Sequence, residues 1–262
     1  MARRYLITGA SAGIGAAFAK TLAAQGVIPI LVARREDRLK AVAADILDDY
    51  AVDAPYHICD LSDRDAVTGL IAAIDGPVDG LINNAGYSIA HAFAAASLGD
   101  HMAFVETSVN TPTRLARALL PGMIAQGYGR IINLSSIVAF SSGAAGHTLY
   151  PAAKAYMLKF SRSLAAEVKD KGVHVTALCP GSTVSEFTHA NGTETVADHS
   201  PFRSLMPTQT VVDAGLRANE AGREVEIPGV FNKAAVAAMT LLPDALLTPL
   251  IRRAAERFMI KD

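Results

Sequence analysis

The sequence has few cysteines, no excess charge of either sign and no long hydrophobic run. Its two cysteines, Cys59 and Cys179, are too few for a disulfide framework, so we expect them to be packing residues in a reducing, cytoplasmic protein. The net charge of -1 is a poor match for nucleic-acid binders, which normally carry a basic excess. The apolar stretch at residues 234–242 stops at Pro243, far short of the roughly 20 residues that span a membrane.

Two other kinds of signal are also missing. The apolar stretch that follows Arg3 and Arg4 is too short for a signal peptide and runs directly into the first predicted strand. The 7 histidines show neither the His-x-x-x-His nor the His-Glu-x-x-His spacing, so no metal site is expected.

Along the chain, short apolar runs alternate with segments whose apolar residues have helical spacing. Hydrophobic residues make up 51% of the 262 residues, which provides for a sizeable core and excludes general disorder. Strands are predicted at residues 5–7, 27–33, 56–59, 78–82, 130–134, 173–178 and 224–227. Helices are predicted at residues 14–25, 36–50, 63–74 (with Ser62 as N-cap), about 98–120 and about 150–170.

This order predicts an α/β fold, a single-domain doubly wound (Rossmann) parallel sheet of about seven strands with helices on both faces. No repeat or linker divides the chain, so one domain is expected over residues 1–262. The polar, turn-rich segment 181–207 breaks the rhythm and is interpreted as a substrate lid, with a disordered surface excursion as the alternative. The apolar tail at 229–262 is expected to cap the fold, or else to make a subunit contact or lie on a membrane surface.

A glycine-rich turn follows the first predicted strand and reads TGASAGIG from Thr8 to Gly15. Residues without Cβ let the backbone approach a pyrophosphate, and the helix N-terminus behind the turn supplies free N–H groups. Tight turns use glycine for purely structural reasons as well. Taken alone, the turn therefore leaves a structural role and a dinucleotide site equally open.

The second predicted strand ends at Ala33 and is followed by Arg34 and Arg35. In a dinucleotide fold this strand end meets the adenosine ribose, where an acidic residue binds the 2′-hydroxyl and an arginine accommodates a 2′-phosphate. The acid is absent here, which favours NADP(H) over NAD(H). The alternative is a solvated arginine pair at the start of a helix.

Tyr150 and Lys154 are four residues apart, a spacing that places both on one face of a helix. An ammonium near a phenol favours the phenolate and lets tyrosine exchange a proton near neutral pH. The pattern is common by chance, but two features strengthen it. The preceding strand ends in Ser135 and Ser136, where ligands bind in parallel sheets. Asn110 interrupts an apolar helical stretch, which indicates a polar role.

Together these motifs resemble the classical short-chain dehydrogenase/reductase family, and within it a poorly characterised NADP(H)-dependent branch. The resemblance covers residues 5 to about 187, and the branch is marked by the Ala-Arg-Arg strand end, a Pro-Gly-x-Thr-x-x-Glu-Phe stretch and a basic, leucine-rich tail. The shared features are TGxxxGIG at 8–15, Asp60-Leu61, Asn83-Asn84-Ala85-Gly86, Asn110, Ser136, Tyr150-x-x-x-Lys154 and Pro180-Gly181.

The resemblance implies an oxidoreductase that transfers a hydride between the nicotinamide of NADP(H) and a small ketone or alcohol. It implies Tyr150 as the general acid/base and Ser136 as the group that polarises the carbonyl. Lys154 is implied to bind the nicotinamide ribose and to lower the tyrosine pKa, and Asn110 to hold a water that links Lys154 to solvent. The residues implied to bind the cofactor are Gly9, Ser11, Ala12, Gly13, Ile14, Gly15, Arg34, Arg35, Asp60, Leu61, Asn84, Ala85, Gly86, Tyr150, Lys154, Pro180, Gly181 and Thr183.

Two features depart from the family pattern. The spacer between Ser136 and Tyr150 is one residue longer than usual, so Ser135 stays open as the polarising residue. Many NADP(H)-dependent members carry a basic residue where Ala12 stands, so the phosphate contact rests on Arg34 and Arg35.

Two other functions stay open. A catalytically silent dinucleotide-binding sensor needs only the glycine turn and Arg34. A 3-oxoacyl reductase calls for a basic surface that receives an acidic carrier protein. Some positive charge is available along one predicted helix, although the spacing suits a solvated face: Lys159, Arg162, Lys169 and Lys171.

Apolar residues in the two loops expected around the site predict a hydrophobic carbonyl substrate: Phe140, Phe187, Phe202, Leu205 and Met206. His147 faces this substrate or lies in solvent. The resembled family commonly forms dimers or tetramers through the helix that carries Tyr150, so a homo-oligomer is expected. The apolar run Met157, Leu158, Phe160 and Leu164 serves that contact or faces the core.

Overall fold

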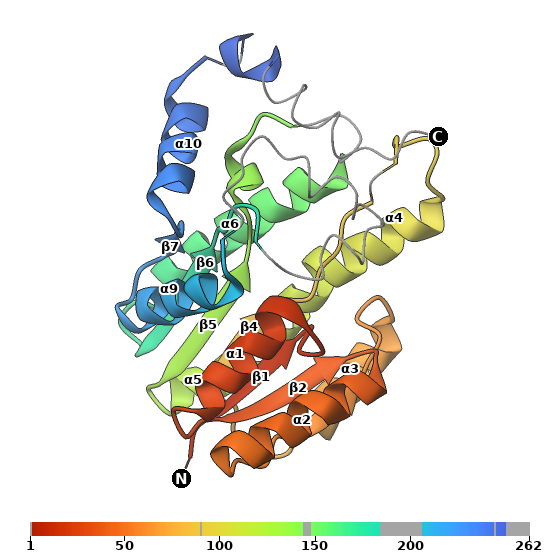
Figure 1. The fold of residues 1–262 in the computed structure, drawn as a ribbon, viewed down its shortest axis with the longest axis vertical. Helices are drawn as coiled ribbons and strands as arrows, with labels where there is room; N and C mark the ends of the chain where they lie inside the picture. Colours follow the sequence, from red (N-terminus) through yellow and green to blue (C-terminus); the bar gives the residue numbers. More distant parts are fainter. Residues whose placement is uncertain (1, 90, 144–147, 184–205, 244, 250–262) are drawn as a thin grey trace.

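A twisted parallel sheet runs through the middle of the molecule (Figure 1). The structure, a computed structural model, describes residues 2–89, 91–143, 148–183, 206–243 and 245–249. Seven strands pair in the order β3-β2-β1-β4-β5-β6-β7, and every pairing is parallel, which confirms the predicted fold class. The strands are β1 (Arg4–Thr8), β2 (Ile28–Ala33), β3 (Tyr56–Ile58), β4 (Gly80–Asn83), β5 (Gly129–Leu134), β6 (Val173–Leu178) and β7 (Val225–Glu226).

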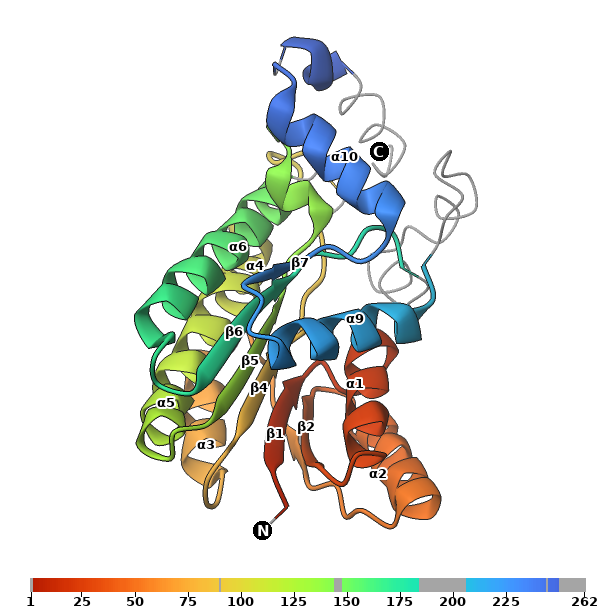
Figure 2. The same cartoon turned by 90° about the vertical axis from the view of Figure 1, so that its left-hand side faces the viewer.

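Helices cover both faces of this sheet. Figure 2 shows α1, α2 and α9 on one face and α3, α4, α5 and α6 on the other. Two buried clusters follow this division, one around Phe18 and Leu39 and the other around Val67 and Leu115. Since both faces are covered, the central strands β1 and β2 are largely apolar and buried. The helical elements are α1 (Gly13–Ala23), α2 (Glu36–Tyr50), α3 (Arg64–Ala73), α4 (Leu98–Val105), the π turn η1 (Glu106–Asn110), α5 (Thr111–Ala125), the 3-10 turn η2 (Ile137–Phe140), α6 (Leu149–Val168), α9 (Thr208–Glu220) and α10 (Val230–Leu241).

Helix α9 was not predicted from the sequence. Its buried face nevertheless has helical spacing, with Val211 and Val212 in the first turns and the small residues Ala214, Gly215 and Ala218 after them. A Cβ atom at Gly215 would lie 2.7 Å from the Leu178 side chain, so the small residue lets α9 approach β6 closely.

Two local predictions were wrong. Asp63, and not Ser62, caps α3, because the Asp63 carboxylate accepts hydrogen bonds from the Asp65 and Ala66 amides. The stretch at about 98–120 is not one regular helix, since the π turn η1 separates α4 from α5. Pro112 has no amide hydrogen to continue the α-helical pattern there.

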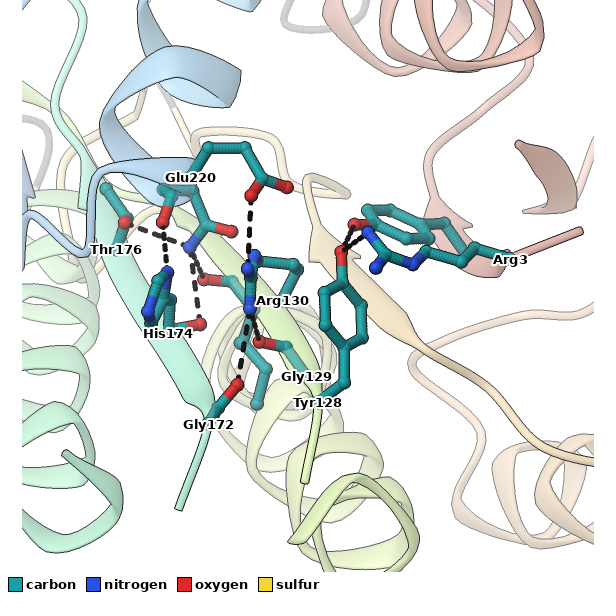
Figure 3. A network of polar contacts seen from close by, with 11 residues as sticks. Arg3, Tyr128, Gly129, Arg130, Gly172, His174, Thr176 and Glu220 are labelled. Atoms are coloured by element: carbon teal, nitrogen blue, oxygen red, sulfur yellow. Dashed lines mark hydrogen bonds and ion pairs between the residues drawn. The ribbon is translucent and has the colours of Figure 1, made fainter. Parts of the chain in front are cut away.

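The amino-terminal ends of the strands carry a polar network (Figure 3). The Tyr128 ring lies between two guanidinium groups, at 3.6 Å from Arg3 and 4.2 Å from Arg130. Arg130 also pairs with Glu220 of α9 at 3.1 Å, which joins α9 to the start of β5. This network stabilises the end of the sheet opposite the glycine turn, so it holds the framework without contributing to a site.

In the part of the chain that the structure describes, no helix is both long enough and apolar enough to cross a lipid bilayer.

Candidate functional site

The glycine turn lies at the carboxyl end of β1, where β2 and β4 flank it on either side. Gly9 and Gly13 have φ angles of 67° and 55°, in the left-handed region that glycine adopts easily. The N-cap of α1, Ala12, provides no side-chain hydrogen bond to the first amides of the helix. The turn therefore offers uncapped N–H groups at a point where the strand order reverses, which suits the pyrophosphate of a dinucleotide.

The turn is also closely packed against its own backbone. A Cβ atom at Gly15 would lie 2.3 Å from the Gly9 carbonyl oxygen. The Asn84 side-chain amide donates to the carbonyl oxygens of Thr8 at 2.9 Å and of Gly9 at 3.3 Å. Sequence reasoning placed Asn84 only along the cofactor, whereas its contacts here hold the shape of the turn.

Substitution of Gly15 by alanine is expected to lower the free energy of unfolding by about 3 kcal/mol, because the added methyl group overlaps backbone that has little freedom to move. Gly69→Ala is the matched control. Gly69 lies inside α3 with open space around it, so alanine there should stabilise by about 0.5 to 1 kcal/mol. Urea unfolding of both variants checks the prediction, which fails if Gly15→Ala is as stable as wild type.

Two exposed arginines lie beside the glycine turn at the end of β2. The Arg35 guanidinium donates to the Ser11 hydroxyl at 3.1 Å, which links the strand end to the turn. Arg34 lies near Asp60. Although partial burial acts in the opposite direction, hydrogen bonds from Ser62 and the charge of Arg34 lower the Asp60 pKa. A localised positive region therefore adjoins the turn in a chain whose overall charge is close to zero.

The first turns of α6 bring Tyr150 and Lys154 together. The Lys154 Nζ lies 5.5 Å from the centre of the Tyr150 ring and donates to the Leu134 carbonyl oxygen at 2.9 Å. A Cβ atom at Gly86 would lie 3.7 Å from the same nitrogen, so the β4 end also reaches this point.

The two candidate serines have different environments. Ser136 forms a side-chain hydrogen bond with Tyr150, and its hydroxyl also donates to the Pro180 carbonyl at 3.4 Å. The Ser135 hydroxyl donates instead to the Lys154 backbone carbonyl at 2.7 Å and is buried. The structure thus brings Ser136 to the phenol, while Ser135 anchors the helix that carries it.

Burial dominates the titration of this pair. It raises the pKa of Tyr150 to about 12, with the Ser136 hydrogen bond acting in the opposite direction. Burial also lowers the pKa of Lys154 to about 8. The expectation that the nearby ammonium lowers the tyrosine pKa is therefore not met in this structure, in which loss of solvation is the largest cause of the shift. The Tyr150 hydroxyl therefore keeps its proton at neutral pH.

Asn110 lies apart from Tyr150, Lys154 and Ser136. Its side chain is exposed and donates to Glu106 Oε2 at 2.6 Å. It lines an outer groove together with Arg64, Thr113 and other residues, and not the cavity beside Tyr150. Because the π turn shifts the helical register, the residues of η1 that point inward are Thr107 and Ser108.

The remaining predicted residues at this edge lie near η2 and α10. The Pro180 carbonyl accepts from the Ile137 amide at 3.0 Å, and Thr183 forms a β-bridge with Met206. A Cβ atom at Gly181 would lie 2.4 Å from the Asn232 side chain, so α10 packs directly against the end of β6. Most of the predicted lid lies outside the described residues, and so does the tail beyond residue 249.

The predicted apolar pocket is only partly described. Phe140 packs against the buried cluster that contains Leu158 and Cys179, and Met206 packs against the cluster of α1. Phe187, Phe202, Leu205 and His147 lie outside the described residues. The cavity beside Tyr150 is lined instead by residues that no motif had indicated: Ile89, His91, Phe93, His101, Thr148 and Leu149.

Further side chains behind the site are core residues. Met157, Leu158 and Leu164 are buried, and the partly buried Phe160 packs against the cluster that contains Leu164, so this run of α6 faces the core. Cys59 and Cys179 are buried, as predicted. A buried polar chain that sequence reasoning missed joins β4 and β5 to α6: Asn83 donates to Asn133 at 2.8 Å, and Asn133 donates to Ser161 at 2.9 Å.

Comparison with known proteins places the chain in a family. A family model described as short chain dehydrogenase matches residues 3–195. Nodulation protein G of Rhizobium sp. (strain N33) is 33% identical over 87% of this chain and 96% of its own length. The 3-oxoacyl-[acyl-carrier-protein] reductase of Escherichia coli K12 is 35% identical over 71% of this chain and 75% of its own.

A solved structure extends this likeness to the fold. The short-chain dehydrogenase from Sphingobium yanoikuyae, solved in complex with NADPH, is 29% identical, with a TM-score of 0.80 over 93% of this chain and 97% of that one. The match to the family model covers the glycine turn, the arginine pair and the Tyr150 helix. The chain therefore belongs to the short-chain dehydrogenase/reductase family and is an oxidoreductase that uses a nicotinamide dinucleotide.

Proposed function

We propose that this protein interconverts a small, largely apolar ketone and its alcohol with NADP(H), and that Tyr150 is the acid/base. The observation that carries the proposal is the hydrogen bond between the Tyr150 and Ser136 side chains, with the buried Lys154 one helical turn away. Two hydroxyl groups that meet in this way can both reach one carbonyl oxygen. A proton donor whose pKa lies near 12 stays loaded for reduction at neutral pH.

Tyr150, Ser136 and Lys154 have separate roles in the proposed reduction. A bound, reduced nicotinamide supplies the hydride. Tyr150 gives its hydroxyl proton to the carbonyl oxygen as that oxygen gains negative charge, and the resulting phenolate recovers a proton from solvent. Ser136 donates a hydrogen bond to the same oxygen. Lys154, charged below a pH of about 8, stabilises the phenolate while it exists.

The proposed cofactor preference rests on the arginine pair. Arg34→Ala is expected to weaken NADPH binding by about 100-fold and to leave NADH binding nearly unchanged, because only NADPH carries the 2′-phosphate. Arg117, an exposed arginine of α5, provides the control Arg117→Ala, which should change neither affinity. Fluorescence titration of both cofactors measures these affinities. Tighter binding of NADH than of NADPH by the wild-type protein would contradict the assignment.

The reaction itself is tested with purified protein, NADPH and a panel of aromatic, alicyclic and small charged ketones. Loss of NADPH absorbance with the apolar ketones is the expected result. Binding of NADPH without turnover of any carbonyl favours the sensor function instead. Preference for small charged 2-oxo acids would contradict the apolar substrate class.

A 3-oxoacyl reductase is the second candidate, because one relative of 35% identity carries that name. The exposed cations of α6, Lys159 and Arg162 among them, offer a surface for an acidic carrier. Turnover of carrier-bound 3-oxoacyl chains far above that of free ketones would favour it. The homo-oligomeric state and the cytoplasmic location stay predictions.

A further inference from the structure

The cavity beside Tyr150 contains a histidine that the proposed reaction does not use. His101 lies on α4 and is 7% exposed, and its ring stacks on the Phe93 ring with centroids 4.4 Å apart and an angle of 13°. His101 and Tyr150 line the same cavity. The cavity has a volume of about 10 Å³, close to the minimum for one water-sized group. A single hydroxyl group of a substrate fits this space.

The hydrogen bonding of His101 determines which ring nitrogen is available. Nε2 lies 2.9 Å from the Phe93 carbonyl oxygen. A carbonyl oxygen only accepts hydrogen bonds, so Nε2 carries the hydrogen. In the neutral ring Nδ1 is then a pure acceptor. Stacking and the Nε2 bond both hold the ring plane, so Nδ1 cannot turn to another partner.

This acceptor is buried without a partner. Nδ1 of His101 is buried, with almost no area open to solvent, and has no hydrogen bond among the residues that the structure describes. A buried acceptor without a donor costs free energy in the folded protein. Ile89, Phe93 and Leu149 provide apolar walls of the cavity, and His91, Thr148 and Tyr150 are its other polar residues. A small pocket with an oriented, unpartnered acceptor can select a ligand that carries a donor group.

We infer that His101 is a specificity-determining residue whose Nδ1 accepts a hydrogen bond from a hydroxyl group on the substrate. The inference rests on the proposed function, in which Tyr150 protonates the carbonyl oxygen. Because His101 and Tyr150 line one small cavity, we place the hydroxyl and the reacting carbonyl on neighbouring carbons. The substrate class is therefore an α-hydroxy ketone with an apolar remainder, and the product is the corresponding 1,2-diol.

A matched pair of ketones tests this inference. 2-Hydroxyacetophenone and acetophenone differ only in the hydroxyl group, and wild-type enzyme with NADPH should show kcat/KM at least about 10-fold higher for the former. His101→Phe keeps a ring that stacks on Phe93 but removes the acceptor. It should reduce that ratio by about 10-fold, with acetophenone turnover changed by less than about 3-fold. Intrinsic reactivity differs between the two ketones, so the change in ratio is the measured quantity.

Two further variants sharpen the result. His101→Asn, which restores an oxygen acceptor near the ring position, should recover part of the ratio. Met102→Gln is the control on the exposed side of α4 and should leave the ratio as in wild type. Thermal unfolding checks that each variant is folded. An unchanged ratio in folded His101→Phe overturns the inference, even where ketone reduction itself is intact.

Binding separates this inference from the proposed function. 1-Phenyl-1,2-ethanediol and 1-phenylethanol can be titrated calorimetrically into the NADPH-loaded protein, in which neither alcohol can react because the cofactor is already reduced. A diol preference of about 10-fold that His101→Phe abolishes supports the acceptor role, even for a protein that reduces neither ketone. In that outcome the proposed reaction fails and the binding site stands. Equal binding of diol and alcohol by the wild type contradicts the acceptor role directly.

Discussion

Tyr150→Phe should lower kcat for ketone reduction by about 1,000-fold while NADPH binding stays within about 2-fold of wild type. The substitution keeps the ring and removes only the hydroxyl that hydrogen-bonds Ser136. Without it, the negative charge that develops on the carbonyl oxygen receives no proton from the protein. Stopped-flow absorbance at saturating NADPH measures the hydride-transfer step, and fluorescence titration measures cofactor affinity.

Tyr156 provides a matched control for this experiment. It lies on the same helix, is exposed, and its hydroxyl contacts Thr113 of α5 at 2.8 Å, away from the cavity of Tyr150. Tyr156→Phe removes the same atom and should leave turnover nearly unchanged. If Tyr150→Phe reduces a good substrate at the wild-type rate, the assignment of Tyr150 as proton donor is wrong.

Lys154→Met should inactivate the enzyme and yet stabilise its fold near neutral pH. Burial lowers the Lys154 pKa from 10.5 to about 8, so below pH 8 the folded protein carries a poorly solvated charge. That charge costs about 3 kcal/mol, and methionine removes the cost. Loss of the hydrogen bond to the Leu134 carbonyl destabilises the variant by about 1 kcal/mol, so its free energy of unfolding should exceed that of the wild type by about 2 kcal/mol.

The sign of the pH dependence follows from the direction of the shift. Between pH 8 and 10.5 the unfolded chain holds the lysine proton more often than the folded protein does. The free energy of unfolding of the wild type therefore rises with pH in this range relative to Lys154→Met. The advantage of the variant is complete below pH 8 and shrinks toward pH 10.5.

Urea unfolding at pH 7 and pH 10 measures this difference, with Lys159→Met as the control. Lys159 is an exposed lysine of the same helix, and its substitution should change stability by less than about 0.5 kcal/mol at either pH. Turnover of Lys154→Met should fall by about 100-fold, because the phenolate loses its neighbouring positive charge. If Lys154→Met is less stable than wild type at pH 7, the buried ammonium does not destabilise the folded protein and the prediction is wrong.

Local sequence was sufficient to predict the sheet, the glycine turn and the pairing of Tyr150 with Lys154. Continuous apolar runs are the mark of strands covered on both faces, and each predicted strand appears within a few residues of its place. Tyr150 and Lys154 are neighbours because residues four apart lie on the same face of a helix. The carboxyl ends of parallel strands lie at one edge of the sheet. Arg34, which follows β2, therefore lies at the same edge as the glycine turn that follows β1.

Tertiary structure determined the orientation, solvation and hydrogen-bond partners of individual side chains, which local sequence patterns do not contain. Asn110 was expected at the site, but the π turn, which reflects the missing amide hydrogen of Pro112, turns it outward toward Glu106. The direction of the Tyr150 pKa shift depends mainly on burial, which the whole fold determines. The unpartnered nitrogen of His101 exists because Phe93 offers it a carbonyl and a stacking surface. Solvation and partner choice depend on the whole fold, since they are set by contacts that no short window of sequence records.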